Sequence, residues 1–294
     1  MTNQPTIGFI GLGAMGRGMS CNVVRKHPGT VLAFDLNPEV LASVVEAGAR
    51  AAMSVAQIGK TADIIFLSLP GGKQVAAVCE EILANAKPGT IVVDLSTTGV
   101  ADARAVHARL AEKKIDFADA PVARARAAAD AGTLSIMVGA SEALFARIEP
   151  YLRYMGTDIN RCGEIGCGQV VKLVNNTLLF EHVAALAEMM VVSERAGVPP
   201  NTLLDVLSIS SADSFALRNH GMKAMLPRAF PEKAFPSDYV LKDLAYAIEM
   251  AEGTNVDARL AKRAGEYYAA AVEQGIGAKY FPAIIELIGK DGEP

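Results

Sequence analysis

Short aliphatic runs alternate with longer amphipathic stretches through the first half of the chain. Residues 64–67 are apolar at every position, which is typical of a strand that is covered on both faces. Strands that alternate with helices of about ten to fifteen residues predict βαβ units and a parallel sheet. The expected strands are residues 6–10, 31–35, 64–69, 91–94, 116–120 and 134–139, and the expected helices are 16–25, 38–47, 72–85 and 101–113.

The pattern changes near residue 163, and from Gln169 onward no convincing strand is visible. Long segments rich in alanine, leucine and methionine follow instead, and the first would be about 42 Å long as a helix. A helix of that length suits a spine between two domains. We therefore expect a doubly wound, mostly parallel α/β domain at 1–163 and an all-α domain at 164–294. Its expected helices are 168–196, 201–208, 239–253, 256–274 and 282–288.

Charge and hydropathy narrow the functional classes. The net charge is −4 and no block of like charges occurs, so neither nucleic acid nor an anionic membrane is an expected partner. A small anionic substrate stays compatible, because one arginine in a cleft can bind it. No apolar run reaches the ~18 residues of a membrane span, and no secretory signal is visible. We expect a cytoplasmic protein.

Cysteine and histidine give no sign of a metal site. The close pair Cys162 and Cys167 lacks further ligands at short spacing, and the four histidines are scattered along the chain. We expect reduced thiols and no bound metal.

Three glycines in the spacing Gly-x-Gly-x-x-Gly join the first expected strand to the first expected helix. The segment consists of Gly11, Leu12, Gly13, Ala14, Met15 and Gly16. The first glycine allows a tight turn, the second lets the backbone approach a pyrophosphate, and the third permits close helix–strand packing. Free N–H groups at the helix start then face the phosphates. In this strand–loop–helix context the six residues predict a Rossmann dinucleotide site.

Asp35 ends the second expected strand. A carboxylate there accepts hydrogen bonds from the adenosine ribose hydroxyls and repels a 2′-phosphate. The following residues 36–39 contain no lysine or arginine to neutralise that phosphate. We therefore expect NAD as the cofactor rather than NADP. The alternative role for Asp35 is a helix cap.

Two further loops, residues 68–72 and 96–98, each follow an expected strand. In an open α/β sheet the carboxyl ends of the strands form the ligand crevice. We expect these loops, with Leu69 and Pro70, to run beside the nicotinamide half of the cofactor. An ordinary turn is the alternative for Pro70 and the two glycines after it.

A general acid or base is still needed for hydride chemistry, and a polar set in the long helix supplies a candidate. Lys172, Asn175 and Asn176 are three to four residues apart and lie near one helix face. A lysine in a dry cleft can exchange protons with a substrate oxygen, and the amides could hold a hydroxyl or carboxylate. The alternative is a lysine and two asparagines that simply face solvent.

The chain resembles the 3-hydroxyacid (β-hydroxyacid) dehydrogenase family, which includes 3-hydroxyisobutyrate dehydrogenase, tartronate semialdehyde reductase and sulfolactaldehyde reductase. The resemblance spans nearly the whole length. It rests on Gly-Leu-Gly-Ala-Met-Gly at 11–16, Asp-Leu-Ser-Thr at 94–97, Asp-Ala-Pro-Val at 119–122, Gly-Thr-Leu-Ser-Ile-Met-Val-Gly at 132–139, Gly-x-x-Gly-x-Gly at 163–168, Lys172 to Asn176, and Lys242-Asp243-Leu244.

This resemblance implies an NAD-dependent oxidoreductase that interconverts a small 3-hydroxy acid and its semialdehyde, of the 3-hydroxyisobutyrate or tartronate semialdehyde type. It implies Lys172 as the catalytic acid and base, with Asn175 and Asn176 orienting the substrate. It also places Thr97 and Lys242 near the cofactor, and it implies a homodimer or homotetramer.

One segment departs from the family pattern. Members usually continue Asp-Ala-Pro-Val with Ser-Gly-Gly, a loop that holds the substrate carboxylate, but here Val122 is followed by Ala123, Arg124, Ala125 and Arg126. A guanidinium offers a two-pronged donor for an oxyanion, and sulfolactaldehyde reductases resemble this chain here. We expect Val122, Ala123 and Arg124 to bind the acidic end of the substrate, a carboxylate or a sulfonate. The alternative is that the arginines point to solvent.

Other classes share this layout. Imine reductases generally lack a lysine at the position of Lys172, and a 6-phosphogluconate dehydrogenase needs a longer helical domain. An NAD-bound scaffold without catalysis is the non-enzyme alternative, and relatives of that kind lose the lysine. The retained Lys172 favours an enzyme.

Overall fold

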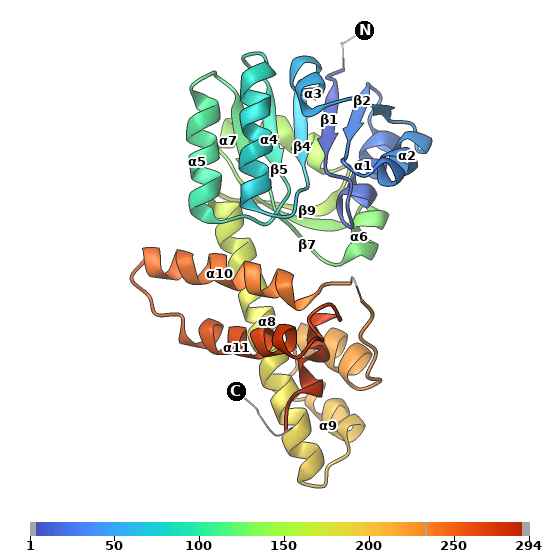
Figure 1. The fold of residues 1–294 in the computed structure, drawn as a ribbon, viewed down its shortest axis with the longest axis vertical. Helices are drawn as coiled ribbons and strands as arrows, with labels where there is room; N and C mark the ends of the chain where they lie inside the picture. The colour runs from blue at the N-terminus through green and yellow to red at the C-terminus, as the bar shows by residue number, and fades with distance from the viewer. Residues whose placement is uncertain (1–3, 233, 290–294) are drawn as a thin grey trace. The chain divides into compact units, whose positions relative to one another are not determined.

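The computed structural model describes residues 4–232 and 234–289 (Figure 1). The chain forms two units, residues 1–172 and 173–294. Their boundary lies inside the long helix α8 (Cys167–Arg195). The sequence pattern changes earlier, because the last strand ends at Gly163.

All six expected strands form, as β1 (Ile7–Ile10), β2 (Val31–Phe34), β4 (Ile64–Leu67), β5 (Ile91–Asp94), β6 (Asp116–Asp119) and β8 (Leu134–Gly139). The strand order is β3-β2-β1-β4-β5-β6-β8-β7, with β9 paired to β8. The ladders from β3 to β6 are parallel, whereas β8 runs antiparallel to β6. The expected doubly wound, mostly parallel sheet is therefore confirmed.

In the first unit, six shorter or more polar elements lie outside the expected set. They are β3 (Arg50–Ala51), α3 (Val55–Thr61), β7 (Val122–Ala123), α6 (Arg126–Ala131), α7 (Glu142–Leu152) and β9 (Gly156–Gly163). The strands β3 and β7 are too short to show a pattern. The strand β9 pairs on one side with β8 and is only partly buried, so it needs no apolar run.

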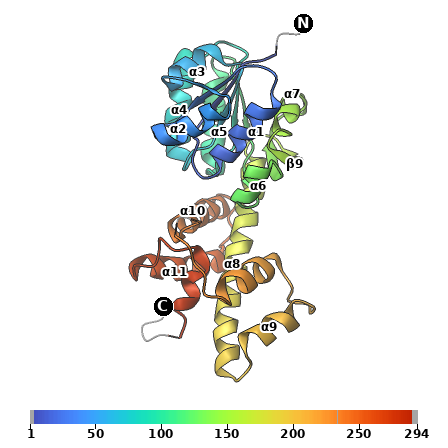
Figure 2. The ribbon, with the colours of Figure 1, turned by 90° about the vertical axis from the view of Figure 1, so that its right-hand side faces the viewer.

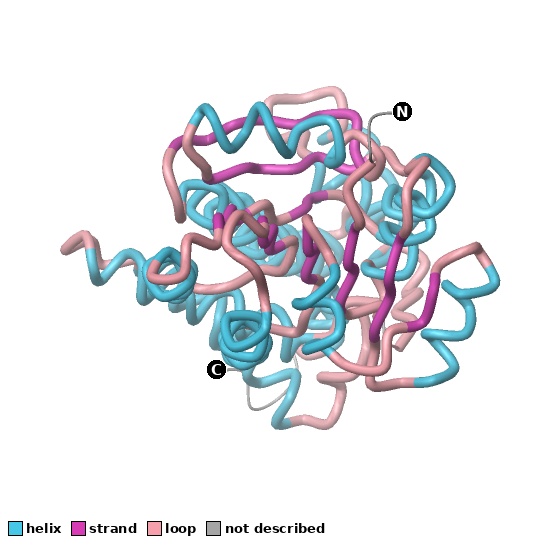
Figure 3. The backbone as a smooth tube through the Cα atoms, turned by 90° about the horizontal axis from the view of Figure 1, so that it is seen from above, coloured by secondary structure: helices cyan, strands magenta, loops and turns pink. Residues whose placement is uncertain are grey.

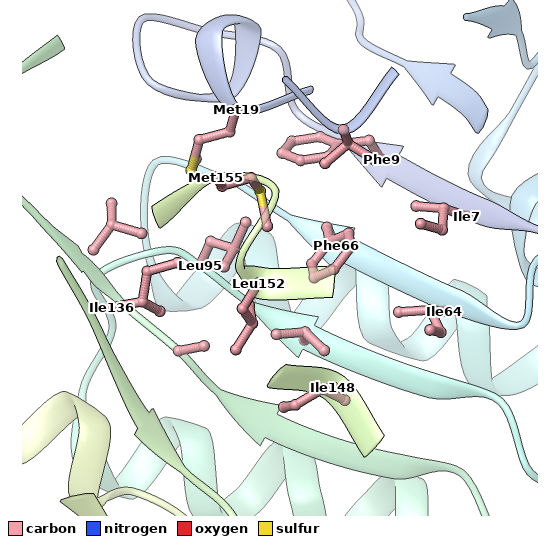
Figure 4. Close-up of a cluster of buried hydrophobic side chains, with 14 of the residues drawn as sticks. Ile7, Phe9, Met19, Ile64, Phe66, Leu95, Ile136, Ile148, Leu152 and Met155 are labelled. Carbon is pink, nitrogen blue, oxygen red and sulfur yellow. The ribbon is translucent and has the colours of Figure 1, made fainter. Parts of the chain in front are cut away.

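Helices cover both faces of the sheet, as Figure 3 shows by the helices on either side of the strands. Alternate residues of each strand point to opposite faces. One face packs α1 (Gly16–Lys26), α2 (Pro38–Glu46), α6 and α7 over a cluster that includes Phe9 and Phe66, whose rings lie 5.9 Å apart (Figure 4). The other face packs α3, α4 (Gly72–Asn85) and α5 (Val100–Ala111).

The register brings the carboxyl ends of five strands into one row. Ile10 is level with Phe34 and Leu67, Leu67 with Asp94, and Asp94 with Asp119. The row continues because Asp119 pairs with Gly139 and Gly139 pairs with Gly163. The loops after these strands, and the entry to α8, therefore meet at one edge of the sheet.

The second unit is helical, and the described residues after Gly163 contain no strand, only one isolated bridge between Pro236 and Tyr280. The expected all-α domain is thus confirmed. Its core joins α8 residues such as Phe180 and Val183 to the elements that follow, and Tyr268 donates a hydrogen bond to the carbonyl of Phe180 at 3.0 Å. Those elements are α9 (Pro200–Leu207), the π-helix η1 (Leu217–Met225), which was not expected, α10 (Ser237–Gly253), α11 (Arg259–Glu273) and the 3₁₀-helix η2 (Phe281–Glu286).

Candidate active site

The glycine loop between β1 and α1 contains two glycines that the fold requires and one that it does not. Gly11 has φ +88°, and a Cβ there would lie 2.2 Å from the carbonyl oxygen of Ser68. A Cβ on Gly16 would lie 2.1 Å from the carbonyl oxygen of Gly11. A Cβ on the exposed Gly13 would meet nothing within 4 Å. The chain therefore leaves open space above Gly13, which fits a bound pyrophosphate.

The first turn of α1 is suited to an anion. Its N-cap residue Met15 makes no side-chain cap hydrogen bond, and no acidic residue lies in the first turn. The N-terminal N–H groups and the positive end of the helix dipole favour a phosphate at such a position. Of the other two residues in the loop, Ala14 is exposed and Leu12 is buried in the core.

Asp35 follows β2 directly and holds the glycine loop. Its Oδ2 accepts a hydrogen bond from the N–H of Leu12 at 2.6 Å, and its Oδ1 accepts one from the N–H of Asn37 at 2.8 Å. The cap of α2 is Asn37, whose side chain accepts from the N–H of Glu39. The alternative role of Asp35 as the helix cap is therefore wrong. Its carboxylate has further lone pairs for ribose hydroxyls.

Hydrogen bonds join the two loops that were expected beside the nicotinamide, residues 68–72 and 96–98. The N–H of Leu69 donates to Oγ of Ser96 at 2.8 Å, and the N–H of Ser96 donates to Oδ1 of Asp94 at 3.0 Å. Pro70 is exposed and Thr97 is half-buried. These contacts fix the loop after β4 against the loop after β5.

A buried carboxylate anchors the start of α8. Asp119 is fully buried, and its two oxygens accept from the N–H groups of Gly166 at 2.7 Å and Gln169 at 2.9 Å. Burial raises the pKa of Asp119, and the N–H donors act in the opposite direction. A charged acceptor at a helix N-terminus stabilises that end of the helix. The first turn of α8 is thus attached to the end of β6.

Gln169 continues this network to the loop after β5. Its Nε2 donates to the carbonyl of Ser96 at 2.8 Å, and its Oε1 accepts from the N–H of Thr98 at 3.1 Å. Lys172 is half-buried and follows Gln169 by three residues, so the two side chains share a face of α8. The structure therefore places Lys172 on a helix that is held against the loop containing Thr97.

The other expected polar residues of the long helix belong to a cluster in the second unit. Asn175 is exposed and donates to Oδ1 of Asn176 at 3.1 Å, and the buried Asn176 donates to Oδ2 of Asp243 at 2.7 Å. Lys242 forms an ion pair with Oδ1 of Asp243 at 3.1 Å, and its Nζ lies over the ring of Tyr239, 5.7 Å from the centroid. Asn176 thus has a fixed orientation.

The side chain of Arg124 is partly exposed, but its guanidinium also binds other residues of the chain. Its Nη1 donates to the carbonyl of Thr133 at 2.5 Å, and its Nη2 forms an ion pair with Asp158 at 2.8 Å. The Thr157 hydroxyl and the charge of Arg124 lower the pKa of Asp158. Arg124 has φ +83°, the left-handed conformation that glycine adopts readily and arginine rarely. Before it, Val122 is buried and Ala123 half-buried.

Three residues of this site had no role assigned from the sequence, namely Asp119, Gln169 and Asp243. Asp119 at a strand end and Gln169 in an apolar helix were visible as polar interruptions, but their partners lie far away in the chain. For Asp243 no signal indicated a buried contact with Asn176. Within the part of the chain that the structure describes, no group of three or more His, Cys, Asp or Glu side chains could hold a metal ion.

Two family models cover most of the chain. Residues 6–166 match the NAD binding domain of 6-phosphogluconate dehydrogenase, and residues 166–288 match the NAD-binding domain of NADP-dependent 3-hydroxyisobutyrate dehydrogenase. The two matches meet at the first turn of α8.

The chain is also similar to individual proteins over almost its full length. It is 38% identical to 2-(hydroxymethyl)glutarate dehydrogenase of Eubacterium barkeri, covering 98% of this chain and 96% of that protein. It is 32% identical to a probable mitochondrial 3-hydroxyisobutyrate dehydrogenase of Dictyostelium discoideum, covering 99% and 92%. The solved 3-hydroxyisobutyrate dehydrogenase of Mycobacterium tuberculosis with L-serine superposes with a TM-score of 0.91 at 31% identity, covering 98% and 100%.

Imine reductases share the fold but little sequence. The enzyme from Pseudomonas sp. superposes with a TM-score of 0.61 at 18% identity, which shows the fold alone. The dehydrogenase relatives match at higher identity, and both family models describe nicotinamide-cofactor domains. The chain belongs to the 3-hydroxyacid dehydrogenase family and is an NAD-binding oxidoreductase of 3-hydroxy acids.

Proposed function

We propose that this protein interconverts a small 3-hydroxy acid and its semialdehyde, with NAD as the hydride carrier and Lys172 as the general acid and base. One observation carries the proposal: Asp119 and Gln169 fix the helix that contains Lys172 to the sheet edge that also presents the glycine loop. The glycine loop and the helix that contains Lys172 are therefore attached to the same edge of the sheet. Preorganised positioning of this kind is a large part of enzymatic rate enhancement.

The residues of the first unit fit the cofactor. Gly13 leaves room for a pyrophosphate at the start of α1, and Asp35 offers carboxylate oxygens beside the loop. When NAD is bound, its nicotinamide ring supplies the hydride chemistry. The protein has to bind and orient both molecules and to move one proton.

Lys172 moves that proton. When the semialdehyde is reduced, the lysine ammonium donates a proton to the carbonyl oxygen as it becomes a hydroxyl. In the oxidative direction the neutral amine accepts the proton from the alcohol. Asn175 and Asn176 orient the substrate, and the contact with Asp243 keeps Asn176 in place.

The acidic end of the substrate is assigned to the segment Val122, Ala123 and Arg124. A left-handed arginine is strained, and such strain often accompanies ligand sites. A substrate anion would compete with Asp158 for the guanidinium. Among similar proteins, one is named for 2-(hydroxymethyl)glutarate, which has two carboxylates. A sulfonate such as sulfolactaldehyde is the second candidate, because the same guanidinium can bind it.

We place the protein in the cytoplasm. The support is that Cys21, Cys79, Cys162 and Cys167 are all free thiols, as is usual in a reducing compartment. Some relatives are named as mitochondrial, so fractionation of cells that express the tagged chain decides between the two.

A screen with Lys172 variants tests the proposed reaction. The absorbance of NADH or NADPH is followed with either NAD or NADP as the cofactor. The substrates are 3-hydroxyisobutyrate, 2-(hydroxymethyl)glutarate, threonate, glycerate, serine and dihydroxypropanesulfonate. We expect turnover of at least one compound, and Lys172→Ala should lower kcat by about two to four orders of magnitude while NAD still binds. Lys172→Arg, which keeps the charge but holds its proton, should be similarly impaired. Near-normal turnover by Lys172→Ala contradicts the assignment, and NAD binding without turnover of any compound favours the scaffold.

The open space at Gly13 gives a test of cofactor binding that is separate from folding. Gly13→Ala should fold with an unchanged melting temperature, since its Cβ meets no atom of the chain. It should weaken NAD binding by about tenfold or more, because the methyl group occupies the place of the pyrophosphate. Gly16→Ala is the matched control and should lose stability, because its Cβ collides with the Gly11 carbonyl. If Gly13→Ala binds NAD as tightly as the wild type, the phosphate lies elsewhere.

The preference for NAD depends on the charge of Asp35. Asp35→Asn keeps an oxygen that can accept the Leu12 N–H but removes the negative charge. We expect the ratio of kcat/KM for NAD over NADP to fall by about tenfold or more, since the repulsion of the 2′-phosphate is lost. The melting temperature of the variant serves as the control. An unchanged ratio would mean that Asp35 does not set the cofactor preference.

Arg124→Ala tests the anion contact. We expect KM for the active acid to rise by about tenfold or more, with a smaller effect on kcat, because the guanidinium binds the non-reacting end of the substrate. Arg126→Ala, an exposed arginine two residues along, should leave KM near the wild-type value. An unchanged KM for Arg124→Ala removes this residue from the substrate site.

A further inference from the structure

A buried asparagine links the helix that follows the glycine loop to the short helix that follows Arg124. Asn22 lies in α1, and 3% of its surface is exposed. Its Nδ2 donates to the carbonyl oxygens of Ala129 at 2.9 Å and Asp130 at 3.1 Å, both in α6, and to that of Gly18 at 3.0 Å in α1. Figures 1 and 2 show α1 and α6 side by side. The amide therefore joins two elements that lie far apart in the chain.

The helix α6 is too short to be stable without contacts to other elements. It consists of six residues, and its N-cap residue Ala125 makes no side-chain cap hydrogen bond. A helix of this length does not persist by itself in water. The last carbonyl groups of a helix also lack their usual partners within the helix, and two such groups of α6 accept from Asn22. Asn22 therefore stabilises the C-terminal end of α6.

The two helices approach each other closely at this end. A Cβ on Gly18 would lie 2.6 Å from Oδ1 of Asp130 and 2.8 Å from the carbonyl carbon of Ala129. Directly after α6, Gly132 has φ +69°, and a Cβ there would lie 2.9 Å from Oδ1 of Asn22. The chain leaves no room for a side chain at either glycine. The end of α6 is thus held at one place on α1.

Both ends of α6 are connected to Arg124. The helix begins two residues after Arg124, which itself follows the strand β7. At the other end, the carbonyl of Thr133 accepts from Nη1 of Arg124 at 2.5 Å. The N–H of Thr133 in turn donates to the carbonyl of Ala128 in α6 at 2.9 Å. A displacement of α6 would therefore move both the backbone and the guanidinium of Arg124.

We propose that Asn22 is a positioning residue for the acidic end of the substrate: it attaches α6 to α1 and so fixes the place at which Arg124 presents its guanidinium. This role rests on the proposed function, in which Arg124 binds the substrate anion. A guanidinium binds an oxyanion through N–H groups in a fixed planar arrangement, so its strength as an anchor depends on where it is held. Asn22 is buried and acts through Arg124 rather than by contact with the substrate.

An exposed ion pair between the same two helices provides a matched control. Arg17 of α1 lies 3.3 Å from Asp130 of α6, and the two side chains are 39% and 44% exposed. Exposed ion pairs contribute little to stability. Asp130→Asn removes the ion pair but keeps the backbone carbonyl that accepts from Asn22.

Hydrogen exchange tests the attachment without a substrate. Asn22→Leu keeps a side chain of similar size that donates no hydrogen bond. The N–H groups of residues 126–133, followed by mass spectrometry, should exchange about tenfold or more faster than in the wild type, because the end of α6 is released. Asp130→Asn should exchange like the wild type. If Asn22→Leu does not fold, Asn22→Ala removes the same amide without adding bulk. Unchanged exchange in a folded variant overturns the proposal.

Steady-state kinetics test the effect on the substrate, with whichever of 3-hydroxyisobutyrate and 2-(hydroxymethyl)glutarate is turned over faster. Asn22→Leu should raise KM for the acid by about fivefold or more, with smaller changes in kcat and in KM for NAD. In an Arg124→Ala background the same substitution should not raise KM further, because Asn22 acts through Arg124. A merely structural role would reduce the amount of active enzyme, and thus the apparent kcat, and leave KM unchanged.

The kinetic outcomes distinguish the role of Asn22 from that of Arg124. If Arg124→Ala leaves KM unchanged, Arg124 is not the anion contact, and the role of Asn22 is wrong as well. If Arg124→Ala raises KM but Asn22→Leu does not, the positioning role alone is overturned. It is also overturned if the two substitutions raise KM independently, since Asn22 would then not act through Arg124.

Discussion

The site depends on the hydrogen bonds that the buried carboxylate of Asp119 accepts from the start of α8. An ionised group without water is costly unless donors surround it, and the N–H groups of Gly166 and Gln169 fill that role. The first turn of α8 lies close to strand β8, because a Cβ on Gly168 would be 2.3 Å from the Met137 carbonyl oxygen. The register that pairs Asp119 with Gly139, and Gly139 with Gly163, brings these groups together. The helix α8 therefore starts at the carboxyl edge of the sheet.

The contacts around a residue indicate whether it is needed for folding or is available to bind a ligand. Gly11 and Gly16 are dictated by contacts within the chain, whereas Gly13 faces open space. Arg124 keeps a backbone conformation suited to glycine, while its guanidinium binds the Thr133 carbonyl and Asp158. At Gly13 the fold leaves open space, and at Arg124 it holds a cation near the surface. These are the two positions that we propose to meet the cofactor and the acidic end of the substrate.

The sequence was sufficient for elements with a strong local pattern. The six expected strands, the glycine loop and the long helix α8 could be predicted, because each shows its pattern within a short window. The edge strand β9 could not, since a partly exposed strand tolerates Asp158, Asn160 and Arg161. The contacts of Asp119 with Gln169, and of Arg124 with Asp158, join residues far apart in the chain. Such pairs depend on sheet register, which no local pattern reports.

The most direct measurement is a crystal structure of the protein with NAD and a substrate that it turns over. We expect a pyrophosphate at the start of α1 beside Gly13, with Lys172 Nζ at about 2.6–3.2 Å from the reacting oxygen of the substrate. We also expect Asp119 to accept hydrogen bonds from the N–H groups of Gly166 and Gln169, as in the present structure. A pyrophosphate bound elsewhere, or a Lys172 out of reach of that oxygen, would contradict the proposed mechanism.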